Sequence, residues 1–141
     1  MIRIMNNAKI DAIKEFFTKD RFATDMGAQI DWVKDGCAEC SLVIADGHKN
    51  AGGAVQGGAI FTLADFAFAV AANSLGKMTV SVNNSISFIS ASKGKKLIAK
   101  ATRLSDSKRL CFYNVSVTDD KGALIADMSV TGYIKDIDMP F

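Results

Sequence analysis

The chain has 141 residues, 49% of them apolar and 23% charged, with a single proline and a net charge of +2. This length allows one domain with a substantial core, and the composition excludes disordered and fibrous proteins. The first eleven residues lack the hydrophobic run and the small-residue cleavage site of a secretory signal, so we expect a cytoplasmic protein whose three cysteines are reduced.

Local patterns predict a helix and then a β-hairpin at the start of the chain. In residues 7–20 apolar side chains recur at three- and four-residue spacing among charged ones, which predicts an amphipathic helix. Residues 28–34 and 37–44 flank Asp35-Gly36, a preferred two-residue turn because both positions need positive φ. On the second strand Cys37 and Cys40 point to opposite faces, so their C-x-x-C spacing is predicted to be neither a redox pair nor part of a metal site.

Residues 57–75 are rich in Ala, Phe, Leu and Ile on nearly every face and predict a helix that is buried all round. A membrane-spanning helix is the rival interpretation of such a segment. A carboxylate at its centre, Asp65, and the glycine pair at its start argue against insertion into lipid. We therefore expect no membrane association.

From Met78 onward the apolar period changes to two, which is typical of half-buried strands. Apolar residues at positions 80, 82, 86 and 88 alternate with polar ones, and further strands are predicted at 97–104, 110–118 and 123–135. These strands are expected to form a four-strand antiparallel meander. Together with the hairpin they predict a single α+β domain over residues 1–141, in which one sheet surrounds the buried helix.

Asp65 is the one charge within this helix, and an ionised carboxylate among apolar side chains is costly unless it is paired, hydrogen-bonded or faces a wet cleft. A structural role, as an acceptor for a neighbouring loop or subunit, is one explanation. The other is catalytic, because the helix start at Gly57 and Gly58 offers backbone N–H groups suited to an oxyanion. Asp65 lies roughly 12 Å further along a straight helix. A substrate that touched both would have to lie along the helix.

The pattern Asn50-x-x-Gly53-x-x-Gln56-Gly57-Gly58-x-x-x-x-Leu63-Ala64-Asp65 resembles the active-site signature of hotdog-fold acyl-CoA thioesterases. The phenylacetic-acid-degradation (PaaI-type) branch is the most similar one, and the resemblance covers nearly the whole chain. It implies the hotdog fold, an antiparallel sheet wrapped around a central helix. It also implies hydrolysis of an acyl-CoA thioester, with aryl and phenylacetyl groups among the candidates, and no cofactor besides the coenzyme A of the substrate.

The resemblance further implies a role for each site residue. Asp65 is the general base or nucleophile, a backbone N–H near Gly57 polarises the thioester carbonyl, Asn50 adds a second polar contact, and Ser81 helps to hold the attacking water. It implies a homodimer in which Asp65 of one chain meets Asn50 and Gly57 of the other. A dimer of such dimers, a homotetramer, is also expected.

One position departs from the family pattern. The family commonly has a histidine where this chain has Gln56, and glutamine cannot take up a proton at neutral pH, so we expect Gln56 to act by hydrogen bonding only. The chain's one histidine, His48, is expected to be a solvated loop residue. Two other functions stay open: a non-catalytic module that binds acyl-CoA as a sensor or carrier, and a hydratase. Hydratases of this fold typically pair Asp with a nearby His, and no His follows His48.

Residues 93–109 hold seven basic residues and one acid, so this segment has a charge of +6 and the remainder −4. Solvated lysines on exposed strands explain the asymmetry as well as an anionic ligand does. Given the resemblance, we expect the phosphates of coenzyme A to be bound there. The candidate binding residues are Gly58, Lys95, Lys96, Lys108 and Arg109. Nucleic acid is a weaker interpretation, because these residues lack interleaved aromatic side chains.

Overall fold

The computed structural model describes residues 5–141. The prediction that residues 1–11 contain no secretory signal therefore falls partly outside the described residues. Within the described residues no helix is both long and apolar enough to cross a bilayer. The elements in chain order are α1 (Asn7–Phe17), α2 (Arg21–Met26), β1 (Gln29–Lys34), β2 (Cys37–Val43), the short 3-10 helix η1 (Asp46–His48), α3 (Gly57–Asn73), β3 (Lys77–Phe88), β4 (Lys96–Asp106), β5 (Leu110–Asp119) and β6 (Leu124–Asp138).

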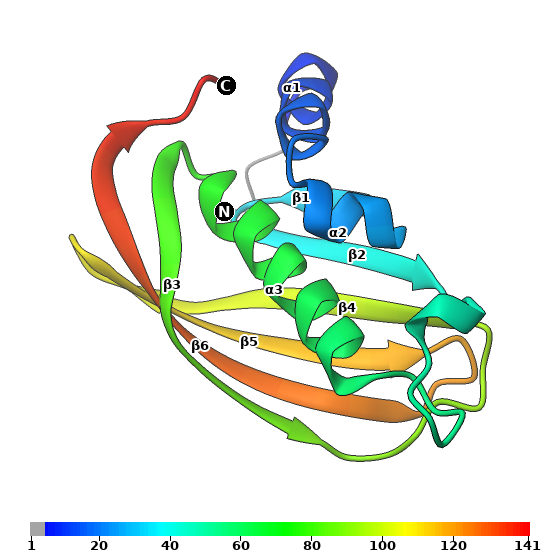
Figure 1. Cartoon of the computed structure of the whole chain (residues 1–141). Helices are drawn as coiled ribbons and strands as arrows, with labels where there is room; N and C mark the ends of the chain where they lie inside the picture. Colours follow the sequence, from blue (N-terminus) through cyan, green and yellow to red (C-terminus); the bar gives the residue numbers. More distant parts are fainter. Residues whose placement is uncertain (1–4) are drawn as a thin grey trace.

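The N-terminal helix is shorter than predicted and is followed by a second one. The Asn6 side chain caps α1 by accepting from the Lys9 N–H at 2.8 Å, and the helix ends at Phe17. The chain then turns, and Asp20 caps α2. The prediction of one helix over 7–20 was wrong because the side chain of Asp20 competes for backbone N–H groups and starts a new helix in another direction (Figure 1).

The predicted hairpin is confirmed. Strands β1 and β2 pair antiparallel across Asp35 and Gly36, whose φ angles of 49° and 71° are both positive, as this tight turn requires. On β2 the alternation of side chains places Cys40 in the core and Cys37, half-buried, on the other face. Both thiols are free, and they point apart as predicted.

The strand order β1-β2-β4-β5-β6-β3 confirms a single antiparallel sheet and corrects the predicted meander. Only β4, β5 and β6 form a meander; β3 pairs with β6, and β4 pairs with β2. The reason is the path of α3, which carries the chain across the face of the sheet from β2, so that β3 forms the edge opposite the hairpin (Figure 1).

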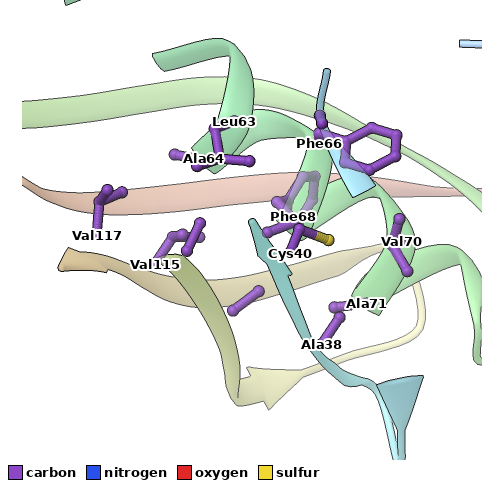
Figure 2. Packing of buried hydrophobic residues seen from close by; sticks show 14 of the residues in the cluster. Ala38, Cys40, Leu63, Ala64, Phe66, Phe68, Val70, Ala71, Val115 and Val117 are labelled. Atoms are coloured by element: carbon purple, nitrogen blue, oxygen red, sulfur yellow. The ribbon is translucent and has the colours of Figure 1, made fainter. Parts of the chain in front are cut away.

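The core lies between α3 and the concave face of the sheet. Figure 2 shows Phe68 of α3 close to Cys40 of β2, with Leu63 of α3 and Val115 of β5 in the same cluster. Phe66 instead packs edge-on against Phe17 of α1. One stripe of α3 does not join this core: Gly58 is exposed, and Thr62, Asp65 and Ala69 are half-buried. The prediction of a helix buried all round was therefore wrong for this stripe. The sheet curves around only part of the helix, and Asp65 lies on the part it leaves uncovered.

Edge strand β3 turns its polar residues, and not its valines, toward α3. Val80 and Val82 are 39% and 59% exposed, whereas Thr79 is buried and Ser81 half-buried. Asn73 fixes this orientation, since its side chain bonds both the N–H and the C=O of Thr79, at 2.8 and 3.1 Å. The predicted burial of the valine face was wrong for this reason.

Candidate active site

The loop before α3 brings the first N–H group of the helix to the surface. Gln56 is the N-cap residue, and its side-chain oxygen Oε1 accepts a hydrogen bond from the Gly57 N–H at 3.1 Å. Its own N–H donates to the carbonyl of His48 at 2.7 Å, which anchors the loop. A hollow of about 260 Å³ lies beside Gly57 and is lined in part by Phe88 and Ser90. An acceptor atom in this hollow can replace Oε1 as the partner of the Gly57 N–H. The positive end of the helix dipole favours an acceptor that carries negative charge.

Asn50 shapes the loop that leads to this helix start. Its Oδ1 accepts from the N–H groups of Gly52 and Ala54, at 3.0 and 3.2 Å, and its backbone N–H donates to the Ala54 carbonyl at 2.8 Å. The side chain is exposed. Within one chain, Asn50 therefore has a clear structural role, because its carbonyl holds the tight turn of the loop.

Asp65 is half-buried on the uncovered stripe of α3, about two helical turns from Gly57. Burial raises the pKa of its carboxyl above the usual range, and the charge of Asp20, at the start of α2, adds to this. A hydrogen bond from the Ser81 hydroxyl opposes the shift. A half-buried carboxyl with a raised pKa is common among catalytic bases, which work best when their pKa approaches the working pH.

The structure brings Asp65 and Ser81 together and leaves Gly57 apart from them. The α3 helix holds Gly57 and Asp65 roughly 12 Å apart along its axis, as expected from their spacing. A thioester carbonyl is too small to span that gap. The five predicted residues therefore form two groups within one chain: Asp65 with Ser81, and Gly57 with Gln56 and the loop that holds Asn50.

Two residues near Asp65 were not predicted. Asp20 comes close because the chain breaks between α1 and α2, and Asn84 donates to Ser81 Oγ at 3.3 Å. The effect of the Asp20 charge on Asp65 could not be read from the sequence, because it depends on how α2 packs. Asn84 was missed because Ser81 and Asn84 are three residues apart and would lie on opposite faces of a regular strand.

His48 is not the solvated loop residue that the sequence predicted. Its Nδ1 accepts from the Ala45 N–H at 2.9 Å, and its Nε2 lies 2.7 Å from the Met26 carbonyl, to which it donates. The ring is half-buried. It links the end of α2 to the loop before α3, a positioning role that uses both nitrogens.

The two predicted basic pairs lie at opposite ends of strand β4, and so at opposite ends of the sheet (Figure 1). Lys95 and Lys96 precede and begin β4, close to the start of α3, and their backbone N–H groups bond Asp120 at 2.9 and 3.3 Å. Lys108 and Arg109 form the β4–β5 turn and line a hollow of about 310 Å³. In one chain, the two pairs cannot hold the same phosphate.

The chemistry available at Asp65 is acid–base and hydrogen-bonding chemistry. In the part of the chain that the structure describes, no three His, Cys, Asp or Glu side chains are grouped to hold a metal ion. Asp65 can accept a proton, the Gly57 N–H can stabilise an oxyanion, and the hollow beside Gly57 can admit a small group.

Known proteins share both sequence and fold with this chain. A sequence profile of the thioesterase superfamily matches residues 52–126. A protein of Archaeoglobus fulgidus, provisionally named an esterase, is 33% identical over 133 residues, which cover 93% of this chain and 86% of that protein. The E. coli PaaI protein of the phenylacetic acid degradation operon superposes with a TM-score of 0.84, at 23% identity over 88% of this chain and 91% of that one. A hypothetical thioesterase of Streptococcus pneumoniae, solved with coenzyme A, superposes with a TM-score of 0.78, at 22% identity over 84% of this chain and 96% of that one. The expected hotdog fold is confirmed.

Proposed function

The chain belongs to the thioesterase superfamily and is a thioester hydrolase, and on this premise we propose that it hydrolyses an acyl-coenzyme A with Asp65 as the catalytic base. The observation that carries the proposal is the half-buried carboxyl of Asp65, whose pKa is raised mainly by burial, on the uncovered stripe of α3. The coenzyme A in the fold neighbour from S. pneumoniae supports this class of substrate. The proposed acyl group of the substrate is an aryl or phenylacetyl group.

In the proposed reaction Asp65 accepts a proton from water as the water oxygen bonds the thioester carbon. The carbonyl oxygen becomes negative, and the N–H of Gly57 stabilises it at the positive end of α3. The C–S bond then breaks, and the proton held by Asp65 passes to the sulfur of coenzyme A. The products are the free acid and the thiol, and no metal or further cofactor takes part.

We propose that the site is shared between two chains, with Asp65 of one facing Gly57 and Asn50 of the partner subunit. Two observations support this. Gly57 and Asp65 are too far apart to act together within one chain. The strand β3, which carries Ser81, forms an edge of the sheet with Val80 and Val82 exposed on it, and such an edge pairs readily with another strand. We also propose that two such dimers form a tetramer and that the protein is cytoplasmic.

Two single variants test the shared site. Gly57→Pro deletes the proposed oxyanion donor but suits the fold, because proline is favoured at the first position of a helix and Gln56 already has ψ of 135°. We expect it to lose about 10²–10³ in kcat. Asp65→Asn should lose about 10²–10⁴. Gly57→Ala is the matched control, since it keeps the N–H and its Cβ would meet only the far end of the exposed Phe88 ring, at 3.2 Å.

Mixing the two inactive variants then shows where the site lies. If Gly57→Pro and Asp65→Asn chains are refolded together, about half of the dimers are mixed and each mixed dimer has one intact site, so about a quarter of the wild-type activity should return. A mixture that forms mixed dimers and stays inactive refutes the shared site. Wild-type turnover by purified Asp65→Asn refutes the assignment of the base.

The two basic pairs are proposed to bind the phosphates of coenzyme A. Neutralising Lys95 with Lys96, or Lys108 with Arg109, should raise KM more than it lowers kcat, because these side chains would contact a part of the substrate remote from the reacting bond. Neutralising two lysines on α1, Lys9 and Lys14, is the control for the loss of two positive charges. An unchanged KM in both paired variants contradicts the proposal.

A second candidate function is a sensor or carrier that binds acyl-CoA without turnover. It is favoured by one observation: Gln56 stands where the family has histidine, and its Oε1 occupies the Gly57 N–H. Tight binding of acyl-CoA by wild-type protein without release of coenzyme A would support this alternative over hydrolysis.

A further inference from the structure

The strand β3 contains an irregularity next to Asp65. Its register with β6 shifts between Ser81 and Asn83, so two successive side chains, Val82 and Asn83, are exposed. An extra residue in a strand reverses the alternation that follows it. Ser81 and Asn84 therefore both point toward α3. The bulge brings them into contact, with Asn84 Nδ2 donating to Ser81 Oγ at 3.3 Å.

This contact decides where the Ser81 proton points. The amide nitrogen of Asn84 can only donate, so Ser81 Oγ is the acceptor and keeps its single proton for another partner. The Asp65 carboxylate is the neighbouring acceptor, because Ser81 lowers the pKa of that carboxyl, as a hydroxyl turned toward it does. Asn84, Ser81 and Asp65 thus lie in sequence, with Asn84 bonded to Ser81 and Ser81 beside Asp65.

Stability does not explain the presence of Asn84. Its carbonyl oxygen Oδ1 is buried and has no hydrogen-bond partner within residues 5–141. A buried carbonyl without a partner costs free energy, and a leucine of similar size would fill the place without that cost. The next inward position on the strand, Ile86, is apolar. A buried polar group that has no partner within one chain is a candidate for a functional use.

We propose that Asn84 is a positioning residue of the active site, which holds the Ser81 hydroxyl so that its proton points at the Asp65 carboxylate. The ordered hydroxyl fixes one carboxylate oxygen and leaves the other oriented to accept a proton from water. This inference rests on the proposed function, in which Asp65 is the base. Asp20, the N-cap residue of α2, is the charged group whose field acts on Asp65, and the variants below leave it unchanged.

The test compares Asn84→Leu and Ser81→Ala with wild type, using the pH dependence of kcat/KM and thermal unfolding. Ser81→Ala removes the hydroxyl that favours the charged form of Asp65, and Asn84→Leu leaves that hydroxyl free to rotate away from it. The acidic limb of the profile should therefore move to higher pH in both variants. We expect kcat to fall about three- to tenfold with little change in KM. The kcat of the double variant should fall no further than that of the more impaired single variant, because both substitutions act on Asp65 through the same Ser81 hydroxyl. Asn84→Leu should be at least as stable as wild type.

The matched control is Asn83→Leu, the same change on the outward side of the bulge, which should leave the acidic limb in place. An unmoved acidic limb and unchanged kcat in Asn84→Leu overturn the inference. A loss of stability and activity together, with the limb unmoved, also overturns it, since that result shows a structural role. Asp65→Asn is assayed in parallel: its wild-type turnover would refute the proposed function, whereas its inactivity with an unmoved Asn84→Leu profile refutes the positioning role alone.

Discussion

Adding one methyl group at Gly132 is expected to destabilise the packing of α3 on the sheet. Gly132 pairs with Ser81 across β6 and β3. A Cβ atom there would lie 2.6 Å from Cys111 Sγ, 2.9 Å from Phe68 Cζ and 3.3 Å from Thr79 Cγ2. Optimal carbon contacts are about 3.5–4.0 Å long, so the sheet and the helix must move apart. Overpacking of this kind lowers the free energy of unfolding by about 1–3 kcal/mol, which corresponds to a fall in Tm of about 4–12 °C for a chain of this size.

Urea and thermal unfolding measure this effect. Gly47→Ala is the matched control, because no atom lies within 4 Å of its Cβ position. Cys111→Ala removes the nearest clashing atom, so Gly132→Ala should cost less in that background than in wild type. Phe68 follows Asp65 by one turn, and we expect kcat to fall as well. A Gly132→Ala protein within about 0.5 kcal/mol of wild type would refute this account of the packing.

Three further predictions concern single side chains. Burial holds the pKa of Asp65 above its value in the unfolded chain, so the protonated carboxyl stabilises the fold below about pH 3.9 and this stabilisation is lost as pH rises through the folded pKa. Asp65→Asn should therefore have a higher Tm than wild type at pH 7 and the same Tm at low pH. A lower Tm of Asp65→Asn at pH 7 contradicts this. Gln56→Ala removes one neutral hydrogen bond, the one at 3.1 Å to the Gly57 N–H, so kcat/KM should stay within about tenfold of wild type; a loss as large as that of Asp65→Asn would make Gln56 essential. Burial alone would raise the pKa of Asp119, but hydrogen bonds from the β5–β6 turn and from the loop before β4 lower it overall. Asp119→Asn should therefore lower Tm at neutral pH, by an amount that shrinks as pH falls below about 3.9. A difference in Tm that stays constant across pH would exclude the charge of Asp119 as the source of the stabilisation.

Local sequence patterns were sufficient to predict those elements whose structure is decided by neighbouring residues. The Asp35-Gly36 turn needs two positive φ angles in succession, and the structure has them. The apolar run after Gly57 was predicted as the central helix, and it forms α3. Asp65 was singled out because a lone carboxylate in an apolar helix requires an explanation, and the structure places it on the one stripe that the sheet does not cover.

Features that depend on distant pairing were not predictable in this way. The position of β3 beside β6 follows from the path of α3 across the sheet, which no local pattern contains. The bulge at Val82 leaves no clear mark in a run of alternating valine and polar residues, so the shared orientation of Ser81 and Asn84 was missed. The approach of Asp20 to Asp65 likewise depends on the packing of α2.

The central claim is that Asp65 catalyses thioester hydrolysis. Release of free coenzyme A from aryl-, short- and medium-chain acyl-CoA substrates tests it most directly, with wild type and Asp65→Asn compared and the signal corrected for the protein's three thiols. We predict release by wild type and a fall of at least about 10²-fold in folded Asp65→Asn. Equal release by the two proteins would contradict the claim.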